Sequence, residues 1–137
     1  MGTSVKEVMT RDVRACEPNA TVAEAAKVMV QEDVGPVPIV EDGRLVGIVT
    51  DRDIVVRVVA EGRDPNATTV GEIASTELVT VSPGDNLDEA LNLLAKRQVR
   101  RLPVVEGDRL VGIVAQADIA RLGKDQKTGE VVEEISR

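Results

Sequence analysis

At 137 residues, of which 42% are apolar, the chain has the size of one compact globular unit with an ordinary hydrophobic core. Its 24 acidic and 17 basic side chains give a net charge of -7, which disfavours general binding to nucleic acid or to anionic membranes. It has no His, Phe, Tyr or Trp and a single cysteine, which excludes an intrachain disulfide, a thiolate metal cluster, a histidine-assisted nucleophile and an aromatic stacking platform.

No stretch of the sequence has the character of a membrane span. The N-terminal residues lack the apolar segment of a signal peptide, and no run approaches the roughly 18 consecutive apolar residues that cross a bilayer. We therefore expect a cytoplasmic protein with no membrane contact.

The chain is an internal duplication. Val5 aligns with Val70 and Ile54 with Ile119, an offset of 65 residues without a gap. The clearest repeated segment is Arg-Leu-Val-Gly-Ile-Val, at 44–49 and 109–114, and an Asp-Ile pair follows it in each half. Agreement of this kind at one offset predicts two similar structural units.

Each half predicts the element order strand, helix, strand, strand, helix. The short first strands are expected at about 13–16 and 78–81. The first helices then begin with capping patterns, Thr21-x-x-Glu24 and Asn86-x-x-Glu89. Their apolar positions follow a helical stripe: Val22, Ala25, Ala26 and Met29 in one half, Leu87, Ala90, Leu91 and Leu94 in the other.

A β-hairpin and a second helix complete each half. The tight-turn dipeptides Asp42-Gly43 and Gly107-Asp108 predict the hairpin turns. The hairpin strands are expected at about 37–41 and 44–50, and again at 102–106 and 109–115, with the second helices beginning at Asp51 and Gln116.

These elements predict an α+β protein of two β-α-β-β-α repeats. The expected divisions are repeat 1 at 5–61, a polar linker at 62–69, repeat 2 at 70–123 and a charged tail at 124–137. Because a repeat of roughly 50 residues buries too little apolar surface to be stable alone, we expect the repeats to pack sheet to sheet with pseudo-two-fold symmetry.

The duplicated pattern resembles the CBS-domain pair, or Bateman module. The resemblance lies in Pro-Ile-Val and Pro-Val-Val before the hairpin turn and in Gly-Ile-Val-x-x-x-Asp-Ile after it, and it covers nearly the whole chain. The chain is similar to short stand-alone bacterial tandem-CBS proteins. This resemblance implies a non-catalytic regulatory module that binds an adenosine-containing nucleotide in the clefts between repeats.

In this family the motif Gly-apolar-x-(Ser/Thr)-x-x-Asp contacts the ribose and phosphate of the nucleotide. The first repeat matches it in full at 47–53, so the resemblance assigns Thr50 and Asp53 to ligand binding. The same residues fit a structural role, because Thr50 is a good N-cap and Asp53 stands where a carboxylate favours the start of a helix. From the residues alone, both interpretations stay open.

The second repeat departs from the motif, since it keeps Asp118 but has Ala115 in place of the hydroxyl residue. We expect its site to be weak or empty. It also carries Arg100 and Arg101 where the first repeat has Gly-Pro, and in nucleotide-binding members of the family a basic pair at this position faces the phosphates. Guanidinium groups suit phosphate, and salt bridges to surface carboxylates are the alternative role.

The resemblance implies that backbone and aliphatic groups hold the adenine, among them Val34, Pro38, Val99 and Pro103, which are also what any core contains. No cofactor is required. The expected ligand is AMP, ADP or ATP, with or without Mg²⁺. S-adenosylmethionine, NAD(H) and a cyclic dinucleotide fit an aliphatic slot as well.

We also expect a homodimer and an unidentified protein partner. The helix from Asp51 is apolar on more than one face, so one face needs a partner. In the family such dimers are disc-like and contain four CBS repeats. The alternative to a nucleotide sensor is a ligand-free dimeric interaction scaffold with vestigial clefts. An enzyme is not expected, because no nucleophile-base pair or metal cluster appears in the sequence.

Overall fold

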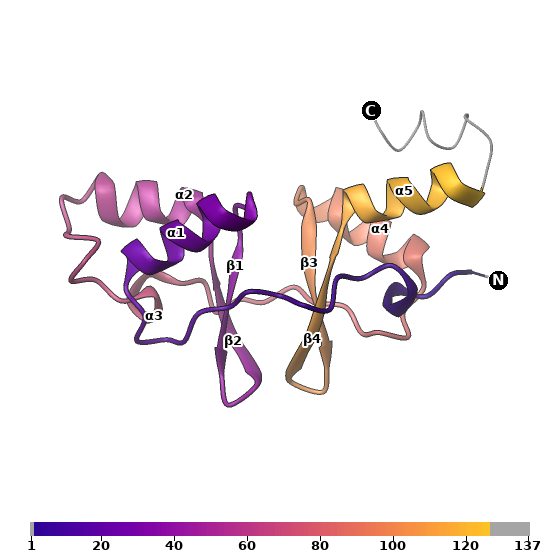
Figure 1. The fold of residues 1–137 in the computed structure, drawn as a ribbon, viewed down its shortest axis with the longest axis horizontal. Coiled ribbons are helices and arrows are strands. Elements are labelled where there is room, and N and C mark those ends of the chain that lie inside the picture. Colours follow the sequence, from indigo (N-terminus) through magenta and orange to yellow (C-terminus); the bar gives the residue numbers. More distant parts are fainter. Residues whose placement is uncertain (1, 127–137) are drawn as a thin grey trace. The chain divides into compact units, whose positions relative to one another are not determined.

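The computed structural model describes residues 2–126 and divides them into two compact units (Figure 1). One unit is continuous in sequence, from Arg14 to Leu78. The other is split, and combines the residues up to Val13 with those from Val79 onward. We call them the continuous unit and the split unit. The predicted tail at 124–137 lies largely outside the described residues.

The continuous unit contains a long helix, a hairpin and two short helices: α1 (Val22–Glu32), β1 (Val37–Glu41), β2 (Arg44–Val49), α2 (Asp51–Ile54) and α3 (Val70–Ile73). α2 continues directly into a wider π-helical turn, Val55–Val59. The hairpin is antiparallel, and its turn residues Asp42 and Gly43 have φ values of 54° and 83°, which match the twist of the strands. The turn predicted from the dipeptide is confirmed.

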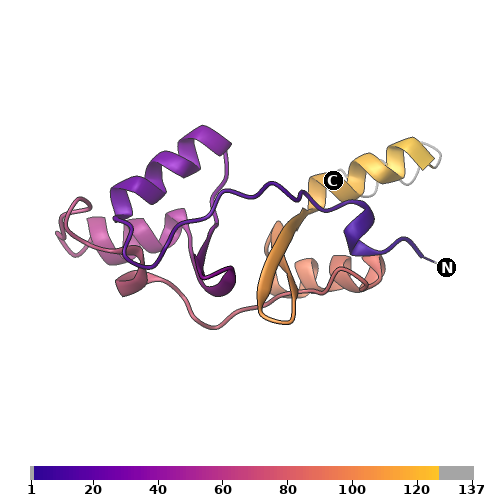
Figure 2. The same cartoon turned by 60° about the horizontal axis from the view of Figure 1, so that its bottom comes forward.

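The split unit has a related set of elements: a 3₁₀ turn (Val5–Glu7), α4 (Leu87–Arg97), β3 (Arg101–Glu106), β4 (Arg109–Ala115) and α5 (Gln116–Gln126). Its hairpin is also antiparallel, with Arg101 opposite Ala115. Figures 1 and 2 both show the indigo N-terminal segment beside the orange and yellow elements from the end of the chain. Helices and hairpins occur in the predicted order, so the α+β tandem-repeat fold is confirmed.

Capping explains where the two long helices begin and end. Thr21 Oγ1 accepts the Glu24 N–H at 3.1 Å, and Glu24 Oε1 accepts the Thr21 N–H at 3.0 Å. Asn86 caps α4 in a related way. α1 and α4 then end at left-handed residues, Asp33 (φ 54°) and Gln98 (φ 56°), which turn the chain toward β1 and β3. Both predicted helix starts are confirmed.

The first strand of each half is much shorter than predicted. In place of strands at 13–16 and 78–81, Cys16 and Val81 each form a single parallel bridge to the following hairpin. Cys16 donates its N–H to the Pro38 carbonyl at 3.0 Å. Each bridging residue is followed two positions later by a proline, which has no N–H to extend the ladder.

The two repeats exchange their first segments. Val5 is fully buried in the split unit and donates its N–H to the Asp85 carbonyl at 2.8 Å. Val70 is fully buried in the continuous unit and donates its N–H to the Ala20 carbonyl at 2.8 Å. Each segment therefore completes the core formed by the body of the other repeat.

The segment predicted as a polar linker, 62–69, is hydrogen-bonded to the continuous unit at its C-terminal end. Thr68 is buried, its carbonyl accepts the Val22 N–H at 2.9 Å, and its hydroxyl donates to the Asp64 carbonyl at 2.8 Å. These bonds hold the segment against the start of α1. The compact units consequently divide the chain differently from the sequence repeats at 5–61 and 70–123.

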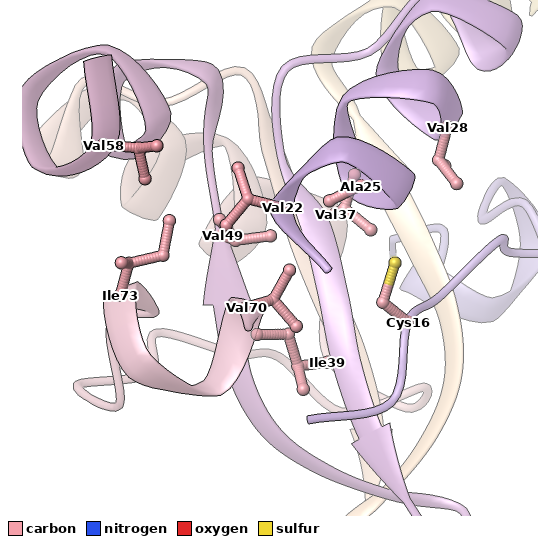
Figure 3. Close-up of a cluster of buried hydrophobic side chains, with 10 residues drawn as sticks. All are labelled: Cys16, Val22, Ala25, Val28, Val37, Ile39, Val49, Val58, Val70 and Ile73. Atoms are coloured by element: carbon pink, nitrogen blue, oxygen red, sulfur yellow. The ribbon is translucent and has the colours of Figure 1, made fainter. Parts of the chain in front are cut away.

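Each unit has its own hydrophobic cluster. In the continuous unit, side chains from α1 and α3 meet those of the hairpin (Figure 3): Cys16, Val22, Ala25, Val28, Val37, Ile39, Val49, Val58, Val70 and Ile73. The split unit buries Val5, Val81, Leu87, Ala90, Leu94, Leu102, Val104, Val114 and Ile119. Burial raises the pKa of the Cys16 thiol, which keeps it a neutral apolar side chain.

Candidate functional site

The complete motif spans the end of β2 and the start of α2. Thr50 is extended and caps the helix: its Oγ1 accepts the Asp53 N–H at 3.1 Å, while Asp53 Oδ2 accepts the Thr50 N–H at 2.9 Å. Both residues are half-buried. The structural role predicted for this pair is therefore confirmed. The bond from the Thr50 N–H uses Oδ2 of Asp53. Within the described residues the other oxygen, Oδ1, has no hydrogen-bond partner.

The corresponding motif of the split unit has a different arrangement at its carboxylate. Asp118 Oδ2 accepts the Ala115 N–H at 3.2 Å, as Asp53 does with Thr50. Ala115 has no hydroxyl to cap α5 in return. The second oxygen, Oδ1, is hydrogen-bonded and ion-paired to Arg121 Nη2. Both oxygens of Asp118 are thus engaged by the protein.

The basic pair lies directly beside this second motif. Arg101 is the first residue of β3 and pairs with Ala115 across the hairpin. The Arg100 carbonyl accepts the N–H of Gln116, the first residue of α5, at 2.9 Å. Arg100 is exposed and Arg101 half-buried. The backbone therefore fixes both residues next to the start of α5.

The continuous unit has the same backbone hydrogen bond, but the side chain beside it is an acidic one. Gly35 stands where the second repeat has Arg100, and its carbonyl accepts the Asp51 N–H at 3.2 Å. A Cβ atom added to Gly35 would lie 3.1 Å from Asp51 Oδ1. A carboxylate therefore lies against this position, in contrast to the arginine pair beside Ala115.

The four residues predicted to line the adenine have unequal surroundings. Pro38 and Pro103 are buried, and their carbonyls accept the N–H groups of Cys16 and Val81. Val34 is half-buried against the core of its unit, whereas Val99 is 42% exposed. The prolines thus have a clear structural role, and contact with a ligand stays a prediction for all four.

A crossing segment passes close to the glycine of each motif. A Cβ atom on Gly112 would lie 2.8 Å from the Thr10 carbonyl oxygen and 2.8 Å from Met9 Sδ. On Gly47 it would lie 3.2 Å from the Ser75 carbonyl oxygen. Thr10 and Ser75 bridge to the residues that follow these glycines, so the first position of the motif accommodates the exchanged segments.

The structure groups the predicted site residues by unit. The continuous unit holds Thr50, Asp53, Val34 and Pro38, and the split unit holds Asp118, Arg100, Arg101, Val99 and Pro103. The complete motif and the basic pair therefore belong to different units.

Sequence reasoning missed two arginines. Arg57 donates from Nη1 to the Ile73 carbonyl at 2.9 Å and so ties the helical turn 55–59 to the end of α3. Arg121 pairs with Asp118, and their spacing of three residues on a helix was a usable signal. The contact of Arg57 had no signal in the sequence, because it depends on the position of α3.

Two kinds of feature are lacking in the part of the chain that the structure describes. No three or more His, Cys, Asp or Glu side chains gather where they could hold a metal ion. No helix there has both the length and the apolar character needed to cross a bilayer.

Comparison with known proteins identifies the family. The CBS-domain model matches residues 5–60 and again 70–125, so the chain belongs to the CBS-domain family and contains two copies of the domain. The CBS domain-containing protein YhcV of Bacillus subtilis (strain 168) is 50% identical over 117 residues, which cover 85% of this chain and 83% of that protein. The recognition made from the repeated motifs is confirmed.

Solved CBS pairs have the same fold and include complexes with adenosine compounds. The CBS domain pair of protein MJ0100, in complex with 5′-methylthioadenosine and S-adenosyl-L-methionine, has a TM-score of 0.79 at 30% identity, covering 93% of this chain and 100% of that chain. CBSX2 in complex with AMP has a TM-score of 0.79 at 26% identity, with coverage of 90% and 98%. CBS-domain pairs are generally regulatory, ligand-binding modules, and this chain is one of them by family.

Proposed function

We propose that this protein is a non-catalytic sensor that binds an adenosine-containing nucleotide, with AMP, ADP and ATP as the candidate ligands. The observation that carries the proposal is the complete motif at Thr50 and Asp53, in which Asp53 Oδ1 has no hydrogen-bond partner among the described residues. The ligands named for the two solved relatives, AMP and the S-adenosylmethionine compounds, share the adenosine group.

Each part of the nucleotide has a matching group in the proposal. Asp53 Oδ1 accepts hydrogen bonds from the ribose hydroxyls, which a neutral side chain would do less strongly. Arg100 and Arg101 are the proposed phosphate-binding groups of the split unit, because a local basic pair must overcome the net charge of -7. Aliphatic groups and backbone contact the adenine, since the chain contains no aromatic side chain.

Calorimetric titration with AMP, ADP, ATP and S-adenosylmethionine, with and without Mg²⁺, tests this proposal. At least one adenosine compound should bind, and Arg100→Ala/Arg101→Ala should weaken phosphate-bearing ligands at low salt. Lys96→Ala/Arg97→Ala is the matched control, because it removes two positive charges from exposed positions at the end of α4. Equal affinities in the two double variants would contradict the phosphate role.

A second candidate function, a ligand-free dimeric scaffold, is favoured by an apolar surface. Val55, Val56 and Val59 are 57%, 46% and 65% exposed along the helical turn that follows α2. An aliphatic row of this kind suits a second copy of the chain, so a homodimer belongs to both candidate functions. A calorimetric signal of binding with an adenosine compound would favour the sensor. A dimer that gives no binding signal with any of these compounds would favour the scaffold.

Sedimentation velocity at concentrations on the order of tens of micromolar tests the homodimer. Val56→Asp should shift the protein toward the monomer, because a carboxylate would be buried in the interface. Val30→Asp is the control, since Val30 is an 82% exposed valine on a different helix, α1. A wild-type monomer at these concentrations would contradict the dimer.

A further inference from the structure

The two matched carboxylates differ in what their free oxygen meets. Asp118 is hydrogen-bonded through Oδ2 to the Ala115 N–H and through Oδ1 to Arg121, and its side chain is only 12% exposed. Asp53 makes the equivalent bond through Oδ2, but the residue three positions further along is Val56, which cannot donate a hydrogen bond. One position of the duplication therefore decides whether Oδ1 is occupied.

We propose that Arg121 is a specificity-determining residue that competes with the ligand's ribose for Asp118 and so keeps the split unit's site weak. This inference rests on the proposed function. A ribose hydroxyl is a neutral donor, and it would have to displace a charge-assisted bond from a guanidinium group. Among the residues that the structure describes, the carboxylate at Asp53 has no such competitor, which leaves it the stronger ribose acceptor.

The direction in which AMP affinity changes when Arg121 is removed separates competition for Asp118 from a general attraction of phosphate by the arginine. Arg121 is positively charged and its side chain is 71% exposed, so as a free charge it would attract a phosphate-bearing ligand. Its removal would then weaken AMP binding. If Arg121 instead competes for Asp118, its removal strengthens AMP binding. The expected gain is roughly two- to fivefold, which corresponds to about 0.4–1 kcal/mol, the upper part of the range for exposed ion pairs.

The test uses the full chain with Arg121→Val, which places the residue of the first repeat at this position. AMP is titrated while the amide NMR signals of Ala115 and Thr50 are followed, because these N–H groups are bonded to Asp118 and Asp53. The affinity reported by Ala115 should rise roughly two- to fivefold, while that reported by Thr50 should not change. Arg97→Val, which removes an exposed positive charge from the same unit, should give no gain.

Two further measurements separate competition from a general structural effect. The gain should vanish when Asp118→Asn is added to Arg121→Val, and it should vanish when 2′,3′-dideoxy-AMP replaces AMP, because that ligand has no ribose hydroxyls. A loss or no change of AMP affinity in Arg121→Val, with AMP still bound by the wild type, would overturn this inference alone. No response to AMP, ADP or ATP in the wild type or in Arg121→Val would overturn the proposed function together with it.

Discussion

The two units use the same backbone to build opposite electrostatic surroundings. In both, a carboxylate caps the N–H of the residue that ends the hairpin, at Asp53 and at Asp118. In the continuous unit the Asp51 carboxylate lies against Gly35, whereas the split unit has Arg100 at the matching position, with Arg101 and Arg121 close to its motif. The carboxylate-to-backbone bond is shared by the two repeats, whereas the charged side chains around it differ.

The largest expected effect concerns the two carboxylates. Asp53→Asn should weaken AMP binding by roughly 10- to 100-fold, the value of hydrogen bonds to a charged group, while Asp118→Asn should change it less than about twofold. Asparagine can still accept the Thr50 N–H, so the helix start is retained. Calorimetry with stoichiometry measures both variants. Equal losses would show two equivalent sites and contradict the asymmetry.

The exchange of segments predicts a crossed pattern of destabilisation. Val5→Ala and Val70→Ala should each cost about 1–3 kcal/mol, because both side chains are fully buried. Hydrogen exchange should then increase in α4 for Val5→Ala and in α1 for Val70→Ala, although the sequence repeats assign these residues the other way round. Faster hydrogen exchange in α1 after Val5→Ala would contradict the swap of first segments between the repeats.

A smaller difference is expected between the motif glycines. Gly112→Ala should lower the free energy of unfolding by about 1–3 kcal/mol, because its methyl group would meet the Thr10 backbone at 2.8 Å. Gly47→Ala should cost less, since the corresponding distance to Ser75 is 3.2 Å. Urea denaturation measures both. A larger loss for Gly47→Ala would show that the crossing segment near Thr10 yields more easily.

The smallest effect is a pH dependence from the helix starts. Hydrogen bonds from the Thr21 backbone and hydroxyl hold the pKa of Glu24 below its ordinary value of 4.5, and Thr69 does the same for Glu72. A lowered folded-state pKa means stability that is present above pH 4.5 and is lost as the pH falls through the folded-state value.

Both of these carboxyls are in the continuous unit, whereas among the described residues of the split unit one such group occurs, Glu7, held by Ser4. Acid should therefore weaken the continuous unit more. Thermal melts followed by circular dichroism at decreasing pH should show a shallower slope for Glu24→Gln than for the wild type. An unchanged dependence of the melting temperature on pH would show that Glu24 does not contribute to the acid sensitivity.

Local features were predictable from the sequence, and long-range ones were not. The Thr21 and Asn86 caps, both hairpin turns and the starts of the second helices follow from patterns a few residues long. The contact of Val5 with Asp85 joins positions far apart in the chain, and no local pattern encodes it. The sequence also could not show that the capping bond uses only one oxygen of Asp53, because that depends on the geometry of the side chain.

The exchanged segments determine the order in which the two units can fold during synthesis. As the chain leaves the ribosome, every residue of the continuous unit is available once Leu78 has been made. Residues 2–13 are translated earlier, yet the hairpin and helices they pack against come from Val79 onward. Residues 2–13 therefore form their native contacts only after residues from Val79 onward have been made, and Val5 cannot be buried in its native core before then.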